Sequence, residues 1–265
     1  MASTFFGLHI GSSALSSFQV ATNTTANNIA NVKTTGYTRQ EATLQAKDAI
    51  NVTARYGSVG TGVTVTSIKQ QRDLYYDNKY WENNSCYGRY EQKLYYMEQI
   101  QNYFKDNGSS VKGFSSVFSQ MFSDLDTLRS KPSDKTVRNQ FISSAQSLCT
   151  YFNQMSDNLS KLQDDCNEEI RNNVDKINSI SEKISLLNKE INQIETGTGV
   201  EASSLRDERA NLIDSLSKIV NVSYNETEVQ NTYGDNLGGT NFSLYINGEK
   251  VVCLLYTSPS PRDAH

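Results

Sequence analysis

Apolar residues recur at steps of three and four from residue 133 to residue 196, and this is the strongest pattern in the chain. Neither proline nor glycine interrupts the pattern between Ser133 and Thr196. Such steps place one apolar stripe along an α-helix, so at 1.5 Å per residue the segment predicts a helix of roughly 90 Å. Helices that long in soluble proteins usually belong to coiled-coil-like bundles. We expect Ser133 to be the N-cap of this helix.

Four shorter segments show helical periodicity. Residues 4–30 have an approximate heptad spacing with several polar seam positions, so this helix needs partner helices for stability, and it ends at an Asn-rich run and Gly36. Residues 70–105 and 114–131 repeat the pattern, with a break at residues 107–109. A capping box at Ser204 predicts an antiparallel return helix to about Lys218.

Two regions favour extended structure. Residues 37–69 alternate in polarity between turn glycines and predict a hairpin or loop between helices. Residues 219–224 predict a strand, residues 225–241 a Gly/Asn-rich loop, and residues 242–252 a hairpin that turns at Asn247-Gly248. The hydrophobic content of 37 % is below the usual 45–50 % of globular proteins. Together these patterns predict a mainly α, elongated fold with a thin core.

Charge and composition exclude several functions. The net charge of −4 provides no basic face for nucleic acid. No stretch approaches the roughly 18 apolar residues of a membrane span, and the N-terminus lacks the features of a cleaved signal peptide. The four cysteines lie far apart, which predicts small buried hydrophobes, and the two histidines lie at opposite ends of the chain. We therefore expect no metal and no cofactor.

Three clusters of residues are candidates for chemistry, and all three favour a structural interpretation. Gly57, Gly60 and Gly62 precede a strand and lack a following Gly-Lys-Ser/Thr, so turn glycines are favoured over a phosphate loop. The carboxylates of Asp164-Asp165 and of residues 206–209 are adjacent on helices and point in different directions, so they do not form an acid/base pair. We interpret residues 206–209 as a solvated helix face.

The last residues, 253–265, differ in composition from the rest of the chain. Two of the three prolines lie there, and the string resembles a translated transposase sequencing adaptor. We therefore expect the natural protein to continue past Val252 and the tail to be an artefact, which should be kept out of fold reasoning.

Three blocks in order resemble the flagellar axial family of rod, hook and hook-associated proteins. They are residues 26–40, residues 60–73 and residues 205–222, and they extend over most of the chain. The residues that carry the motifs are Asn28, Ile29, Asn31, Gly36, Tyr37, Thr38, Arg39, Gln40, Gly60, Gly62, Val63, Leu205, Asp207 and Arg209.

The resemblance implies a domain organisation and a function. Residues 1–33 would form an inner coiled-coil (D0-like) helix, residues 34–220 a helical D1-like domain with a small β-element, and residues 221–252 the start of a β-rich outer domain. The implied function is a structural subunit, not an enzyme, at the junction of hook and filament. Its partners would be itself in a ring of about eleven subunits, the hook protein, the filament-side junction protein and the flagellar export apparatus, which would secrete it.

Two alternatives remain open. The first is another axial protein, a hook or rod subunit, although these generally lack so long an uninterrupted helix. The second is a hydrolase of cell-wall glycan, but its catalytic residues would have to lie in a part of the protein beyond this chain.

Overall fold

The computed structural model describes residues 5–51, 57–105, 113–230 and 236–252. By their contacts the residues form two compact units, one of residues 1–86 with 177–265 and the other of residues 87–176. The predicted break at residues 107–109, Cys253 and the tail from residue 253 lie outside the described residues.

The described residues are mainly α-helical, as the periodicity predicts. The helices are α1 (Phe6–Ala30), α2 (Leu74–Tyr103), α3 (Phe114–Ser130), α4 (Lys135–Glu195) and α5 (Ser203–Ser217). The long helix is confirmed as α4, which runs uninterrupted for 61 residues. Its predicted N-cap, however, is wrong by one position. The side chain of Asp134, not of Ser133, accepts a hydrogen bond of 2.8 Å from the amide of Thr136.

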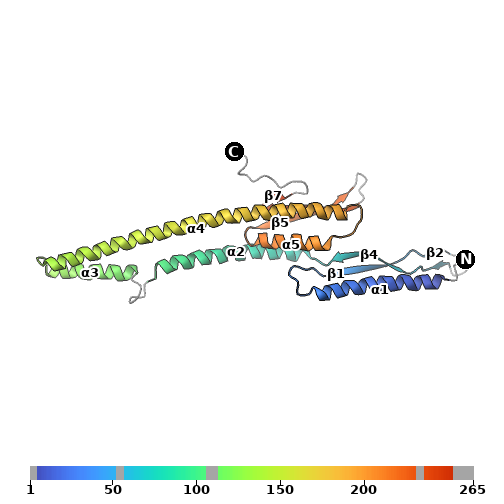
Figure 1. The fold of residues 1–265 in the computed structure, drawn as a ribbon, viewed down its shortest axis with the longest axis horizontal. Helices are drawn as coiled ribbons and strands as arrows, with labels where there is room; N and C mark the ends of the chain where they lie inside the picture. The colour runs from blue at the N-terminus through green and yellow to red at the C-terminus, as the bar shows by residue number, and fades with distance from the viewer. Residues whose placement is uncertain (1–4, 52–56, 106–112, 231–235, 253–265) are drawn as a thin grey trace, which may run out of the picture. The chain divides into compact units, whose positions relative to one another are not determined.

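An antiparallel hairpin follows α1 and confirms the extended structure predicted for residues 37–69. Strand β1 (Gln40–Ala46) pairs with β4 (Val63–Gln70), with a bulge between Thr43 and Leu44. The short strands β2 (Ile50–Asn51) and β3 (Ser58–Val59) continue it. Figure 1 shows α1 lying along this hairpin, and the Ser17 hydroxyl donates a hydrogen bond of 3.1 Å to the carbonyl of Val63.

A three-stranded antiparallel sheet has the order β5 (Val222–Gln230), β6 (Asn236–Ile246), β7 (Glu249–Val252). The hairpin that turns at Asn247-Gly248 is confirmed, and both turn residues have positive φ, 50° and 90°. The loop predicted over residues 225–241 is wrong, because β5 and β6 occupy most of that range. The Asn and Gly content suggested a loop, whereas alternate positions of β5 face the core.

The core of the first unit joins α2, α4, α5 and the sheet. Its members that expose 2 % or less of their surface are Trp81, Ile184, Ile213, Leu216, Phe242, Leu244 and Val252. Each aliphatic or aromatic side chain removed from water in this way contributes about 1.5–3 kcal/mol before entropy costs. The core therefore fixes the sheet against α5, which carries the third sequence block.

In the second unit α3 packs against α4 through aromatic side chains. The rings of Phe114 and Phe152 are 5.9 Å apart, and Met155 and Leu162 of α4 are largely buried. The α2 side chains Gln92 and Tyr96 both donate hydrogen bonds to the carboxylate of Glu169 on α4. These contacts confirm a helix bundle with polar cross-links.

The cysteine prediction is wrong for the described residues. Cys86 and Cys149 are exposed and Cys166 is half-buried. None of the helices in the described part of the chain is both long and apolar enough to cross a membrane.

Candidate assembly site

The first sequence block forms a hydrogen-bonded lock between the end of α1 and the start of β1. The side-chain amide of Asn28 donates to the carbonyl of Gln40 (2.8 Å) and its Oδ1 accepts from the Gln40 amide (3.0 Å). The hydroxyl of Tyr37 donates to the same oxygen at 2.8 Å. Asn28 thus provides partners for both the N–H and the carbonyl of Gln40, as a neighbouring strand would, and it fixes where the extended segment begins.

A second group of polar side chains ends α1. The Asn31 side chain donates to the carbonyl (3.0 Å) and Oδ1 (2.9 Å) of Asn27, and Thr34 donates to Oδ1 of Asn31. The Asn27 side chain also donates to the Tyr37 hydroxyl at 3.1 Å. Since the last carbonyls of a helix lack intrahelical partners, these amides hold the chain as it leaves α1. Ile29, in contrast, is 69 % exposed.

Gly36 lets the loop approach α5 closely. Its φ is +76°, and a Cβ at this position would lie 1.7 Å from Oδ1 of Asn211. Gly62 has φ +108°, and its Cβ would lie 2.2 Å from the Ser13 hydroxyl. Both positions require glycine, because the backbone has a positive φ and because a Cβ would clash with a neighbouring side chain. Gly60 is exposed and has open space around it, so no steric reason for glycine applies there.

Asp207 joins all three sequence blocks. Its Oδ2 accepts a hydrogen bond from the Thr38 amide (3.3 Å), and its Oδ1 accepts one from the Gln70 side chain (2.8 Å). Gln70, the last residue of β4, also donates to the carbonyl of Ser203 at 2.9 Å. A single carboxylate, 8 % exposed, thereby connects the loop after α1 and the end of β4 to α5.

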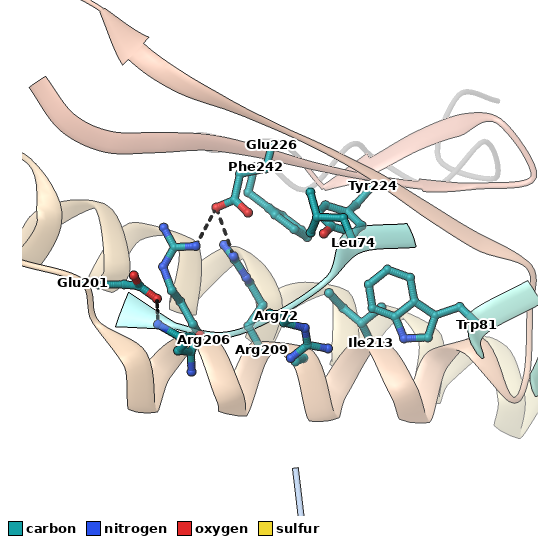
Figure 2. A pocket seen from close by; sticks show the side chains of 12 residues that line it. Arg72, Leu74, Trp81, Glu201, Arg206, Arg209, Ile213, Tyr224, Glu226 and Phe242 are labelled. Carbon is teal, nitrogen blue, oxygen red and sulfur yellow. Dashed lines mark hydrogen bonds and ion pairs between the residues drawn. The ribbon is translucent and has the colours of Figure 1, made fainter. Parts of the chain in front are cut away.

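Behind this joint lies a buried charge cluster on α5 (Figure 2). Glu226 of β5 pairs with Arg206 at 3.1 Å and with Arg209 at 3.2 Å. Arg206 also pairs with Glu195 at the end of α4, at 2.6 Å. Arg209 donates to the side chain of Asn188, and its guanidinium lies 4.0 Å from the ring centre of Phe242. The cluster therefore ties α4, α5 and the sheet together.

These contacts overturn two predictions for residues 203–209. Asp207 and Arg209 are buried, at 8 % and 5 % exposure, so the segment is not a solvated helix face. The capping box at Ser204 is also wrong, because α5 begins at Ser203 and has no side-chain cap. Instead Glu195 reaches from α4 and accepts a hydrogen bond of 3.0 Å from the Ala202 amide. A partner from another helix replaces the local cap.

Burial and charge shift the pKa values of three carboxyl groups here. Burial raises the pKa of Glu201 and of Asp214, although hydrogen bonds from the Gln70 amide and from Trp81 oppose the shift. Burial would raise the pKa of Glu226 too, but Arg209 and Arg206 outweigh it, and the pKa of Glu226 is lowered. Glu226 thus stays ionised as the centre of the cluster.

The remaining motif residues have separate positions. Arg39 is exposed and pairs at 3.5 Å with Glu41. The carbonyl of Val63 accepts a hydrogen bond from Ser17, and Leu205 is half-buried on α5.

The sequence did not indicate three residues of the site, Gln70, Glu195 and Glu226. The burial of Glu226 could have been predicted from the sequence. Alternate residues of a strand face the same side, and Glu226 follows the core-facing residues Val222 and Tyr224 at steps of two along β5.

The arrangement suits mechanical connection better than reaction chemistry. A cavity of about 150 Å³ lies beside the charge cluster, lined by Trp81, Ile213, Tyr224 and Phe242 as well as by the arginines. The arginines in this lining pair with carboxylates of the chain itself. Among the described residues, no group of three or more His, Cys, Asp and Glu side chains is arranged to hold a metal ion.

Two family profiles match the chain. Residues 97–253 match the helical domain of the flagellar hook-associated protein FlgK, and residues 8–38 match the flagella basal body rod protein.

Relatives that align with most of this chain belong to the same family. Flagellar hook-associated protein 1 of Bacillus subtilis is 34 % identical over 234 residues, which is 86 % of this chain and 46 % of the relative. The proteins of that name from Salmonella typhimurium and Escherichia coli are 33 % and 31 % identical over 91 % of this chain, and 41 % and 42 % of their own lengths are covered. The chain thus spans less than half the length of these relatives.

A solved structure supports the fold. The flagellar hook junction protein FlgK from Burkholderia pseudomallei aligns with a TM-score of 0.51 and 23 % identity, over 68 % of this chain and 29 % of that one.

Proposed function

Because this chain belongs to the FlgK family of flagellar hook-associated proteins, we propose that it is part of a structural subunit at the junction between hook and filament. The observation that carries the proposal is the match of residues 97–253 to the helical domain of that family. The relatives named flagellar hook-associated protein 1 extend the likeness to most of the chain.

The domain organisation follows the same proposal. Residues 1–33 act as an inner coiled-coil helix, residues 34–220 as the helical domain, and residues 221–252 as the start of an outer β-rich domain. In support, the seam residues Leu8, Leu15 and Ile29 of α1 are each about 70 % exposed (71, 71 and 69 %). Apolar side chains at heptad spacing are stable in water only when another helix covers them.

The motif residues have a structural role in this proposal. Asn28 and Tyr37 fix the exit from α1, and Gly36 and Asp207 hold that exit against α5. A subunit in a rotating tube must pass force between its inner and outer parts without unfolding. A joint made of buried hydrogen bonds and a charge cluster resists such force because every opening exposes unpaired polar groups.

The proposed partners are those of an axial subunit. We expect copies of the same protein in a ring of about eleven, the hook protein on one side and the filament-side junction protein on the other. Secretion through the flagellar export apparatus would bring the subunit to its place. Open head-to-tail contacts between subunits generate helical tubes rather than closed dimers, which is the geometry that the function requires.

The second candidate is another axial protein, a hook or rod subunit. The match of residues 8–38 to the rod protein profile favours it for the first helix. The helical-domain match and the 61-residue α4 favour the junction protein instead. The structural assignment also agrees with a site in which the buried arginines pair with carboxylates of the same chain.

Deletion of the gene in the bacterium that encodes this chain tests the proposal. A junction subunit predicts cells with complete hooks but without attached filaments, and restored filaments after complementation with the intact gene. A missing hook would indicate a hook or rod subunit, and unchanged filaments would refute an axial role.

A further inference from the structure

Glu201 lies where the end of β4 meets the start of α5. Its Oε1 accepts a hydrogen bond of 3.2 Å from the backbone amide of Gln70. The side chain of Gln70 donates to the carbonyl of Ser203 at 2.9 Å and to Oδ1 of Asp207 at 2.8 Å. We call these three hydrogen bonds the Gln70 joint. Because one residue of β4 supplies every donor, the end of the strand is held to α5 or released from it in a single step.

Glu201 has few partners for a carboxylate in this position. A carboxylate offers about four sites to hydrogen-bond donors. Within the described part of the chain, however, Glu201 accepts one hydrogen bond and forms no ion pair. The side chain is half-buried, so water reaches only part of it. An ionised Glu201 is therefore poorly compensated while the joint is closed.

The arginines around Glu201 are engaged by other carboxylates. Glu201 and three arginines line the cavity of about 150 Å³ beside the charge cluster (Figure 2). Each of these arginines pairs with a carboxylate other than Glu201: Arg72 with Asp77, Arg206 with Glu195 and Glu226, and Arg209 with Glu226. Glu201 is thus the carboxylate of this cavity at which a proton is retained most easily.

Charged groups from three elements act on the ionisation of Glu201. Burial raises its pKa above the ordinary value of 4.5, and the negative charge of Glu195 at the end of α4 adds to the shift. The Gln70 amide, Arg206 of α5 and Lys69 of β4 favour the ionised form but do not outweigh burial. The closed joint therefore binds a proton more readily than a glutamate side chain in water does.

We propose that Glu201 is a proton-dependent latch: the Gln70 joint is tighter while Glu201 carries a proton and loosens when Glu201 ionises. The protonated group keeps a carbonyl oxygen that accepts from the Gln70 amide, so the joint closes without a buried charge. Because the joint ties the hairpin of β1 and β4 to α5, acidity sets how firmly the hairpin is held. This inference does not depend on the proposed place at the hook–filament junction.

Linkage fixes the direction of the effect. The pKa of Glu201 is raised in the closed joint and ordinary in the open one. Closure is therefore favoured below about 4.5 and loses this contribution as pH rises to the pKa of the closed state. The total fold-change in the opening equilibrium equals the ratio of the two acid dissociation constants.

Amide hydrogen exchange at Gln70, measured by NMR on the 265-residue chain from acid to neutral pH, tests the latch. Dividing the intrinsic rate of an unfolded chain by the observed rate at each pH gives a protection factor, which removes the base catalysis of exchange itself. Protection of the Gln70 amide should fall as pH rises above about 4.5, by the fold-change given above. The Asn247 amide, which donates to the carbonyl of Asn221 at 3.1 Å, is the internal reference and should not follow this curve.

Glu201→Gln removes the titration but keeps an acceptor for the Gln70 amide. In this variant the protection of Gln70 should be independent of pH over the same range. Glu208→Gln, at an exposed carboxylate of α5, is the matched control and should keep the pH dependence of the unaltered chain. Constant protection in the unaltered chain, or an unchanged pH dependence in Glu201→Gln, overturns the proposal.

Titration of the carboxyl groups in the unaltered chain covers the case in which Glu201→Gln does not fold. Carbon NMR of the Glu201 carboxyl should give a pKa above 4.5, and the difference should account for the fold-change in protection at Gln70. A pKa of Glu201 at or below 4.5 overturns the proposal. Asp207 is the other carboxylate of the joint, and protection that follows the titration of Asp207 instead would refute the role of Glu201.

Discussion

The indole N–H of Trp81 donates a hydrogen bond of 2.6 Å to Oδ1 of Asp214 and so fastens α2 to α5. Trp81 is 2 % exposed, and its ring lies 5.2 Å from that of Tyr224. The core of the first unit is therefore organised around a polar contact as well as apolar packing. Because Trp81 is the only tryptophan in the chain, its fluorescence reports on this core directly.

Replacement of Asp214 by alanine should destabilise the first unit. The variant leaves the buried Trp81 N–H without a partner, which costs about 1–3 kcal/mol. Urea unfolding followed by tryptophan fluorescence measures the loss. Glu82→Ala is the control, since Glu82 lies on the same helix as Trp81, is 64 % exposed in a surface pair with Lys79 and should change stability by less than about 0.5 kcal/mol. Equal effects of the two variants would contradict the account.

Glu226→Gln should cost more than any surface variant. It removes the carboxylate that pairs with Arg209, and an uncompensated buried charge costs roughly 3–5 kcal/mol. The same substitution at Glu41, which pairs with Arg39 at the surface, should cost about 0–1 kcal/mol. Thermal unfolding of the two variants side by side gives the comparison, and a loss near zero for Glu226→Gln would show that the cluster does not stabilise the fold.

Glu226 and Glu201 should affect the pH dependence in opposite directions. The pKa of Glu226 is lowered in the folded chain, so its stabilisation is present above the ordinary value of 4.5 and is lost as pH falls through the folded pKa. The pKa of Glu201 is raised, so its contribution is present below about 4.5 and is lost as pH rises through the folded pKa.

The two glutamine variants separate these contributions. Between pH 7 and pH 3 the stability deficit of Glu226→Gln should shrink as pH falls, whereas Glu201→Gln should lose stability relative to the unaltered chain as pH falls. Unfolding free energies at several pH values measure both slopes. Slopes of the same sign would mean that the pKa values of the two carboxyls do not shift as described.

Gly36→Ala should strain the loop between α1 and β1, which packs against α5 at this position. A positive φ costs a non-glycine residue about 1–2 kcal/mol, and the added Cβ also meets Asn211. Asn211→Ala, added to Gly36→Ala, should recover only the part of the lost stability that comes from the clash with Asn211. Gly60→Ala, at an open position, should be close to neutral. Chemical unfolding ranks the three variants; a neutral Gly36→Ala would refute the close approach.

Asn28→Ala should release the start of β1. The Gln40 amide donates to Asn28 Oδ1, so its hydrogen exchange should accelerate when the acceptor is removed. Asn28→Asp keeps an acceptor for Gln40 and Tyr37 but loses the bond to the Gln40 carbonyl, and it should give an intermediate rate. Exchange at Gln40 that is the same in all three chains would show that the lock does not form.

The sequence predicted elements better than it predicted partners. The 61-residue α4 and the turn at Asn247-Gly248 follow from local periodicity and from residues that tolerate positive φ, and both were found. The loop prediction for residues 225–241 is wrong because it rests on Asn and Gly content, whereas the pairing of β5 with β6 depends on residues far apart in the sequence.

The same limit explains the errors at the site. Glu195 caps α5 from a different helix, and Asp207 is buried by the loop after α1, 169 residues earlier in the chain. Helical position alone cannot reveal either contact. Gly36 was recognised as part of a motif, but the reason for glycine there, the approach of Asn211, required the fold.

Localisation of the protein tests the central claim most directly. Gold-labelled antibodies against the intact protein, viewed by electron microscopy on isolated flagella, should mark a narrow band where the curved hook meets the filament. The same band should be lost in the deletion strain. Label spread along the hook, confined to the rod, or missing from the flagellum would contradict the assignment to the hook–filament junction.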